Sequence, residues 1–71
     1  MVQTVKIRKG EKSFKVHFMY NTDLVDIMND NNGWWYRKER CWVFPNNKFD
    51  SLYDELTKKM YKVRITRENH A

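Results

Sequence analysis

The sequence predicts an α+β fold, a two-layer sandwich in which two helices cover one face of a mainly antiparallel, five-stranded sheet in the order ββαββαβ. Two observations lead to this fold class. Apolar and polar residues alternate over 2–20 and again over 61–66, which is the period of a half-buried strand. Apolar residues recur at helical spacing over 22–30 and 49–60, which is typical of amphipathic helices.

A first hairpin is expected from residues 2–8 and 13–20. Gly10 lies in the charged stretch between the two runs, where a glycine is typical of a tight turn. Both runs place apolar residues on one side and mostly basic residues on the other. The apolar stripe of the second run is Phe14, Val16, Phe18 and Tyr20. We expect this stripe to face the core and the basic stripe to face outward.

The first helix is expected over 22–30. Asn21 or Thr22 can cap its N-terminus, and the stretch 29–33, rich in asparagine and ending in Gly33, is a strong stop signal. The second helix, over 49–60, begins after Pro45, and Asn46 or Asn47 can cap it. Its apolar stripe is Phe49, Leu52, Tyr53, Leu56 and Met60.

A last strand follows over 61–66. A chain of 71 residues has room for one thin core, so we expect one domain over 1–66 and a C-terminal tail over 67–71. The residues expected to be largely buried are Phe14, Val16, Phe18, Leu24, Met28, Phe49, Leu52, Leu56 and Val63.

The segment 34–44, WWYRKERCWVF, predicts a second hairpin that closes at residues 37–40 and pairs Trp35 with Trp42 and Tyr36 with Cys41. One face then carries Trp34, Tyr36, Cys41 and Val43, and the other carries Trp35, Trp42 and Phe44 together with Arg37 and Arg40. We expect Trp35 and Trp42 outside, because burying two unpaired arginines beside them is costly. The reverse arrangement, with Trp34 and Tyr36 as the exposed rings, is a close alternative.

The charge is divided unevenly along the chain. The net charge is +5, yet the two helical spans, with Lys48 counted in the second, sum to −3 and the rest of the chain sums to +8. Helices on one side would therefore form an acidic layer backed by a basic sheet. Any one-sided sheet exposes polar residues, but that alone does not explain why these are nearly all cationic. The open face would present Lys6, Arg8, Lys15, Arg37, Arg40, Lys62 and Arg64.

A basic face with aromatic rings indicates a nucleic-acid-binding protein that holds single-stranded or junction DNA with little sequence specificity; RNA stays open. We expect phosphate contacts from Lys6, Arg8, Lys15, Lys62 and Arg64. Arg37, Lys38 and Arg40 would form a basic hairpin tip, and Trp35 and Trp42 would stack on bases. The alternative is a protein-interaction module, a homodimer or a small effector or inhibitor, that uses the same surface.

The sequence offers little for catalysis. Cys41 is the only cysteine and has no partner for a nucleophile dyad, and His17 and His70 are the only histidines. We expect no enzyme activity, no catalytic or metal-binding residues and no cofactor. The absence of a long apolar run argues against a membrane span or a secretory signal, and the single cysteine favours a reducing, intracellular compartment, cytoplasm or nucleus.

The order of strand, short helix, aromatic hairpin ending in Trp-x-Phe-Pro and amphipathic helix resembles the HARP domain, the substrate-recognition module of annealing helicases. Residues 24–28 would be its first helix, 35–45 its hairpin and 49–56 its second helix, within a match over about 14–60. The resemblance implies binding of branched or single-to-double-strand junction DNA. The chain includes no motor, so annealing is not implied. A Trp-x-Phe strand in that pattern favours a core position for Trp42.

A weaker likeness links the chain to the small single-strand-binding transcription coactivators. They are also basic sheets backed by a helix, and they work as dimers. Their order of four strands followed by one helix does not match the helix expected over 22–30.

Overall fold

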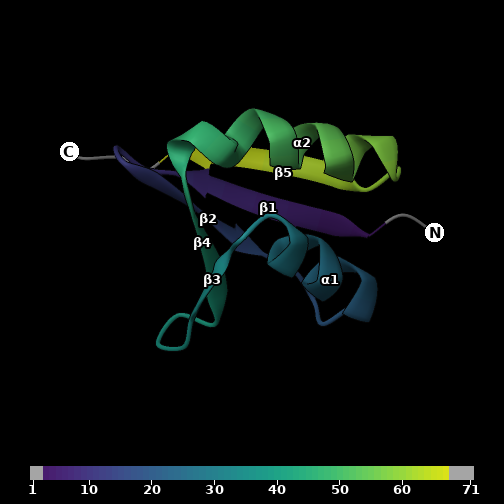
Figure 1. Ribbon diagram of the computed structural model, residues 1–71, viewed down its shortest axis with the longest axis horizontal. Helices are drawn as coiled ribbons and strands as arrows, with labels where there is room; N and C mark the ends of the chain where they lie inside the picture. The colour runs from purple at the N-terminus through teal and green to yellow at the C-terminus, as the bar shows by residue number, and fades with distance from the viewer. Residues whose placement is uncertain (1–2, 68–71) are drawn as a thin grey trace.

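The computed structural model describes residues 3–67, and its elements follow the order ββαββαβ (Figure 1). The strands are β1 (Thr4–Lys9), β2 (Ser13–His17), β3 (Trp34–Tyr36), β4 (Cys41–Pro45) and β5 (Lys62–Arg67). The helices are α1 (Thr22–Asp30) and α2 (Phe49–Lys58), the second preceded by a 3-10 turn, Asn46–Lys48. β5 runs one residue into the predicted tail, and residues 68–71 lie outside the described residues.

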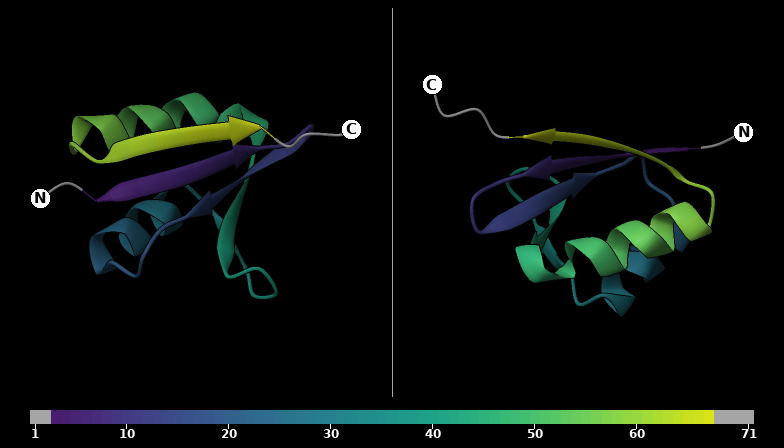
Figure 2. Two further views of the ribbon diagram at one scale, coloured as in Figure 1. Left: turned by 180° about the vertical axis from the view of Figure 1, so that it is seen from behind. Right: turned by 90° about the horizontal axis from the view of Figure 1, so that it is seen from above.

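The five strands form one mixed sheet in the order β3-β4-β2-β1-β5. β1 and β5 are parallel, and every other neighbouring pair is antiparallel. Seen from above, both helices lie on the same side of the sheet (Figure 2). The predicted two-layer α+β fold, with a mainly antiparallel sheet, is therefore confirmed.

The pairing register assigns each strand residue to one of two faces, because side chains alternate and directly paired residues share a face. The helix-covered face holds one core, formed by Val5, Ile7, Phe14, Val16 and Phe44 of the sheet, Leu24, Ile27 and Met28 of α1, and Leu52 and Leu56 of α2. The open face carries Thr4, Lys6, Arg8, Lys15, His17, Trp34, Tyr36, Cys41, Val43, Lys62 and Arg64. Most of the predicted core is buried, whereas Phe18, Phe49 and Val63 are half-buried at its margin.

The first helix has the predicted bounds and cap. The Asn21 side-chain oxygen accepts hydrogen bonds from the backbone N–H groups of Asp23, at 2.8 Å, and Leu24, at 3.3 Å. The second helix differs, because no side chain among residues 3–67 caps it and it ends at Lys58, two residues before the predicted end. Met60 has φ 68°, a left-handed conformation that stops the helix and turns the chain into β5.

Gly33 allows the closest approach between α1 and the second hairpin. A Cβ atom at this position would lie 2.5 Å from Cζ of Phe44 and 3.0 Å from the backbone oxygen of Met28. Phe44 cannot yield easily, since its ring stacks on Phe14 with 5.2 Å between centroids. The glycine is therefore required by packing rather than by a special backbone angle.

The predicted pairing of the second hairpin is confirmed, but the predicted facing is wrong. Trp35 pairs with Trp42 and Tyr36 with Cys41, as expected. Trp42, however, also pairs with the buried Val16, so Trp35 and Trp42 lie on the helix-covered face. The side chain that decides the facing is Phe44, which is fully buried and pairs with Phe14. Trp34 and Tyr36 are consequently on the open face, as in the alternative arrangement.

Candidate nucleic-acid interface

All five strand cations expected to contact phosphate lie on the open face, and they fall into cross-strand rows. His17, Lys6 and Arg64 are direct neighbours on β2, β1 and β5. Lys15 and Arg8 form a second row across β2 and β1. Lys62 lies next to Thr4, toward the other end of β5. Like charges placed directly opposite one another destabilise a sheet, so these rows cost free energy unless an anion compensates them.

One of the two rows has its own anion. Glu39, in the loop between β3 and β4, reaches back over the open face to both cations of that row. Its Oε2 lies 2.8 Å from Lys15 Nζ and its Oε1 lies 3.2 Å from Arg8 Nη2. The hydrogen bond from Lys15 holds the pKa of the Glu39 carboxyl below its usual value and raises the pKa of Lys15. The carboxylate thus occupies a place that a phosphate could take.

The other row has no such partner. Among residues 3–67, Lys6, Lys62 and Arg64 form no ion pair, and all three are exposed. His17 completes the row, half-buried between its neighbours. Burial, followed by repulsion from Arg8, lowers the pKa of His17, so the imidazole is held in its neutral form. Lys6 and Arg64 are therefore the charged members of this row, and both face solvent.

The hairpin tip covers part of the open face. Lys15 Nζ lies 5.7 Å from the centroid of the Tyr36 ring, and Glu39 lies beside it. Beneath this group Cys41 is fully buried, on the open face rather than in the main core. Burial raises the pKa of the Cys41 thiol, which keeps it protonated. Arg37 and Lys38 are exposed in the same loop.

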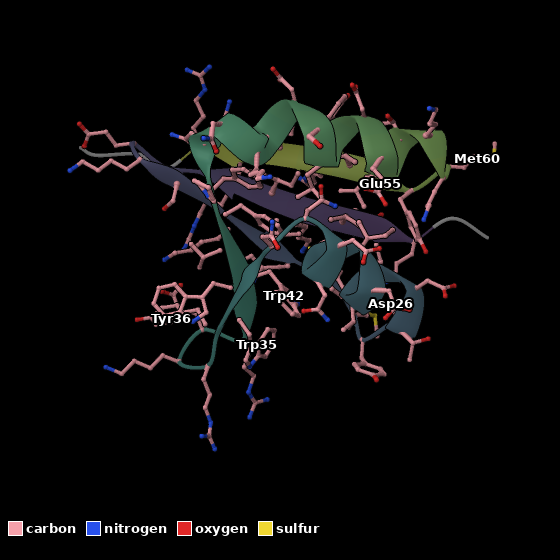
Figure 3. All side chains as sticks on the ribbon, viewed as in Figure 1. Asp26, Trp35, Tyr36, Trp42, Glu55 and Met60 are labelled. Carbon is pink, nitrogen blue, oxygen red and sulfur yellow. The ribbon has the colours of Figure 1, made fainter. Side chains whose placement is uncertain are left out.

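Two tryptophans of the hairpin differ in exposure and in surroundings. Trp34, on the outer strand of the open face, is 75% exposed. Trp35 is 45% exposed and meets Trp42 edge to face, with 5.5 Å between ring centroids. Figure 3 shows Trp35 and Trp42 on the side of the hairpin that looks toward α1, and Tyr36 on the opposite side. Trp35 and Trp42 were predicted to form one platform on the open face. The structure has two separate aromatic sites instead, one with Trp34 on the open face and one with Trp35 and Trp42 on the helix-covered face.

Two depressions meet near the end of β2. A groove of about 840 Å³ runs along the open face and is lined by Gln3, Thr4, Lys6, His17, Phe18, Met19 and Arg40. A cleft of about 500 Å³ on the helix-covered side is lined by Val16, Phe18, Tyr20, Val25, Trp35, Arg40 and Trp42. Phe18 and Arg40 line both, so the two depressions lie next to each other. Arg40 has φ 51°, a left-handed conformation within the hairpin loop.

The opposite side of the molecule is acidic, as the charge division predicts. The exposed carboxylates of the helices are Asp23, Asp26 and Asp30 on α1 and Asp50 and Asp54 on α2. Glu55, by contrast, links the two helices, because it accepts a hydrogen bond from the buried Asn31 side chain at 3.0 Å. A polyanion would therefore be repelled from the helical layer and attracted to the sheet.

Sequence reasoning missed the role of Glu39 and the position of the clefts. Glu39 was visible only as one acid in a basic tetrapeptide, and its contacts are 24 and 31 residues away along the chain. The clefts depend on β2 ending at His17, three residues before the end of the alternating pattern.

Two further features are absent from residues 3–67. No helix there is long and apolar enough to cross a membrane. No three metal-ligating side chains gather in the same part of the chain. In the comparisons with known proteins, no family model, no curated protein and no solved structure matches this chain.

Proposed function

We propose that this protein binds single-stranded nucleic acid, including the single-stranded part of a DNA junction, on the open face of its sheet. Lys6, Lys62 and Arg64 bind phosphates directly. Lys15 and Arg8 join them when a phosphate displaces the Glu39 carboxylate. Arg37, Lys38 and Arg40 hold the strand at the hairpin tip. Such binding depends on the charge of the phosphates and on bases that are not paired, rather than on the base sequence of the ligand.

The observation that carries this proposal is the uncompensated row of His17, Lys6 and Arg64. Neighbouring strands are about 4.8 Å apart, so the two charged members of the row, Lys6 and Arg64, repel one another in the free protein. A string of phosphates would convert that repulsion into attraction and release counterions. An uncharged partner would leave the repulsion in place. The acidic helical layer behind the sheet repels a polyanion, so the polyanion is favoured on the open face of the sheet.

The rings of the open face support a single-stranded ligand. Trp34 is mostly exposed, and Tyr36 lies beside Lys15. Flat rings next to cations can stack on unpaired bases while the cations hold the phosphates, whereas bases inside a duplex are not available for stacking. The resemblance of the chain to HARP domains points to the same class of ligand.

Fluorescence anisotropy of labelled oligothymidylate, blunt duplex and forked DNA, measured over a range of salt concentrations, tests the proposal. We expect the single strand and the fork to bind more tightly than the duplex, with affinity that falls steeply as salt rises. An RNA strand of matched sequence tells whether the sugar matters. Salt-independent self-association that is abolished by Trp34→Ala, with no binding of any strand, would replace this proposal by the protein-interaction alternative.

A further inference from the structure

The cleft on the helix-covered side is an aromatic site with a single charge. Its ring-bearing walls are Phe18, Tyr20, Trp35 and Trp42, and its aliphatic walls are Val16 and Val25. Among residues 3–67, Arg40 is the only charged side chain that lines it. Its volume of about 500 Å³ is in the range of small-molecule sites. These walls suit a flat apolar ligand that carries negative charge at one end.

The position of the cleft links it to the open face. β2 ends at His17, and the chain then passes through Phe18 toward α1, so the sheet is interrupted at this point. The basic groove of the open face reaches the same place and shares Phe18 and Arg40 with the cleft. A strand that lies in the groove therefore passes the mouth of the cleft, with Arg40 between the two.

We propose that the cleft takes one unpaired base from the strand that lies on the open face. The base enters between Trp35 and Tyr20, and its phosphate stays at the mouth on Arg40. This inference rests on the proposed function and adds a specific site to it. A nucleotide matches both parts of the site, since it joins an aromatic ring to a phosphate. A paired base cannot enter without leaving its duplex, so the cleft also gives a reason for preferring single strands.

The exposure of the side chains fits an unfilled stacking site. Trp35 keeps 45% of its surface exposed although its ring edge packs on Trp42, and Tyr20 is 83% exposed at the rim. Figure 3 shows Trp35 and Trp42 side by side between the hairpin and α1. A stacked base would cover the free faces of these rings.

The test compares two ligands of equal charge, a thymidylate oligomer of about 12 nucleotides and an abasic oligomer of the same length, which keeps the phosphates and lacks the bases. We expect the protein to prefer the thymidylate oligomer. Trp35→Ala should reduce that preference by about 5- to 150-fold, the effect of losing one stacked base. Tyr20→Ala should reduce it in the same direction with little effect on folding, because Tyr20 is so exposed. Tyr53→Ala, an aromatic substitution on α2 at a residue that lines neither depression, is the control.

The outcomes separate the cleft from the open face. If Trp35→Ala and Tyr20→Ala weaken both oligomers equally, or neither, the cleft takes no base, while the proposed binding of the strand on the open face still stands. If free thymidine monophosphate binds the cleft as tightly as the oligomer does, the ligand is a mononucleotide and the inference is wrong. If neither oligomer binds, the proposed function and the cleft inference fail together.

Discussion

Glu39 and Lys15 form a hydrogen-bonded ion pair across the open face, with 2.8 Å between Glu39 Oε2 and Lys15 Nζ. The same carboxylate also accepts from Arg8, so one loop residue pairs with two strand cations. Both partners are on adjacent strands, where their charges would otherwise repel. Free protein thus holds an internal anion at the point where the proposed ligand would bring a phosphate.

Replacing that internal anion should strengthen binding. Glu39→Gln keeps the shape of the side chain but removes its charge, so Lys15 loses the carboxylate that pairs with it and becomes available to phosphates. We expect tighter binding of oligothymidylate at moderate salt and a salt slope steeper by about 0.7 units, the value for one additional contact to a single strand. Salt titrations by anisotropy measure both quantities.

The matched control is Glu11→Gln, which removes the same charge from an exposed position in the turn between β1 and β2. It should raise affinity much less, because Glu11 does not occupy the cation row. Equal effects of the two substitutions would mean that only the net charge matters.

The position of His17 predicts opposite effects of pH on stability and on binding. Its pKa is lowered in the folded protein, so the unfolded chain takes up the proton more readily. The stability that neutral His17 contributes is present above about pH 6.5 and is lost as the pH falls. A bound polyanion favours the protonated ring, so affinity should rise over the same interval.

Urea unfolding and anisotropy titrations between about pH 5.5 and pH 8 measure these two trends. His17→Gln should reduce the pH dependence of stability and the pH dependence of binding, because glutamine does not titrate. If binding in the variant rises with acidity as strongly as in the unmodified protein, His17 is not part of the interface.

Much of this fold could be predicted because its local patterns and its tertiary packing agree. The alternation of apolar and polar residues predicted the strands. The apolar residues at helical spacing, among them Leu52 and Leu56, predicted which face of α2 is buried. The register of the second hairpin followed from the length of its charged loop. Which face of this hairpin is buried could not be predicted, because both faces carry large rings. An alternating pattern divides a strand into two faces but does not tell which of them points to the core. Phe44 decides it by stacking on Phe14, a contact between distant segments.

Only the strand cations of the candidate site could be predicted from the sequence. Lys6, Arg8, Lys15, Lys62 and Arg64 share a face because strand alternation places them there. The cleft around Trp35 and the contacts of Glu39 depend on where β2 stops and on how the loop folds back. Those features arise from tertiary packing and leave no periodic signal in the sequence.

Burial of the α2 stripe predicts a large loss of stability in Leu52→Ala. Leu52 is fully buried between α2 and the sheet, and its truncation should lower the free energy of unfolding by about 2–5 kcal/mol. Urea unfolding followed by circular dichroism measures this loss. Thr57→Ala, at an exposed position of the same helix, should stay within about 0.5 kcal/mol. A Leu52→Ala midpoint equal to that of the control would contradict the described core.

Close packing at Gly33 predicts that even one methyl group is harmful there. In Gly33→Ala the new Cβ would overlap the Phe44 ring, so either the ring or the hairpin must move. We expect a loss of about 1–3 kcal/mol in the free energy of unfolding, the usual effect of overpacking. Gly10→Ala serves as the control, because Gly10 also has no positive φ and lies in the β1–β2 turn. Two variants with the same stability would show that the contact at Gly33 relaxes freely.

The open face is tested most directly by reversing charges on the two sides of the molecule. One variant carries Lys6→Glu and Arg64→Glu on the sheet, and the other carries Asp50→Lys and Asp54→Lys on α2, all at exposed positions. Anisotropy titrations of oligothymidylate over a range of salt, with urea midpoints to confirm folding, measure the effect. We expect the sheet variant to lose affinity strongly and its salt slope to fall by about 1.4 units, while the helix variant binds at least as well as the unmodified protein. Loss of binding in the helix variant with normal binding in the sheet variant would contradict the assignment of the open face.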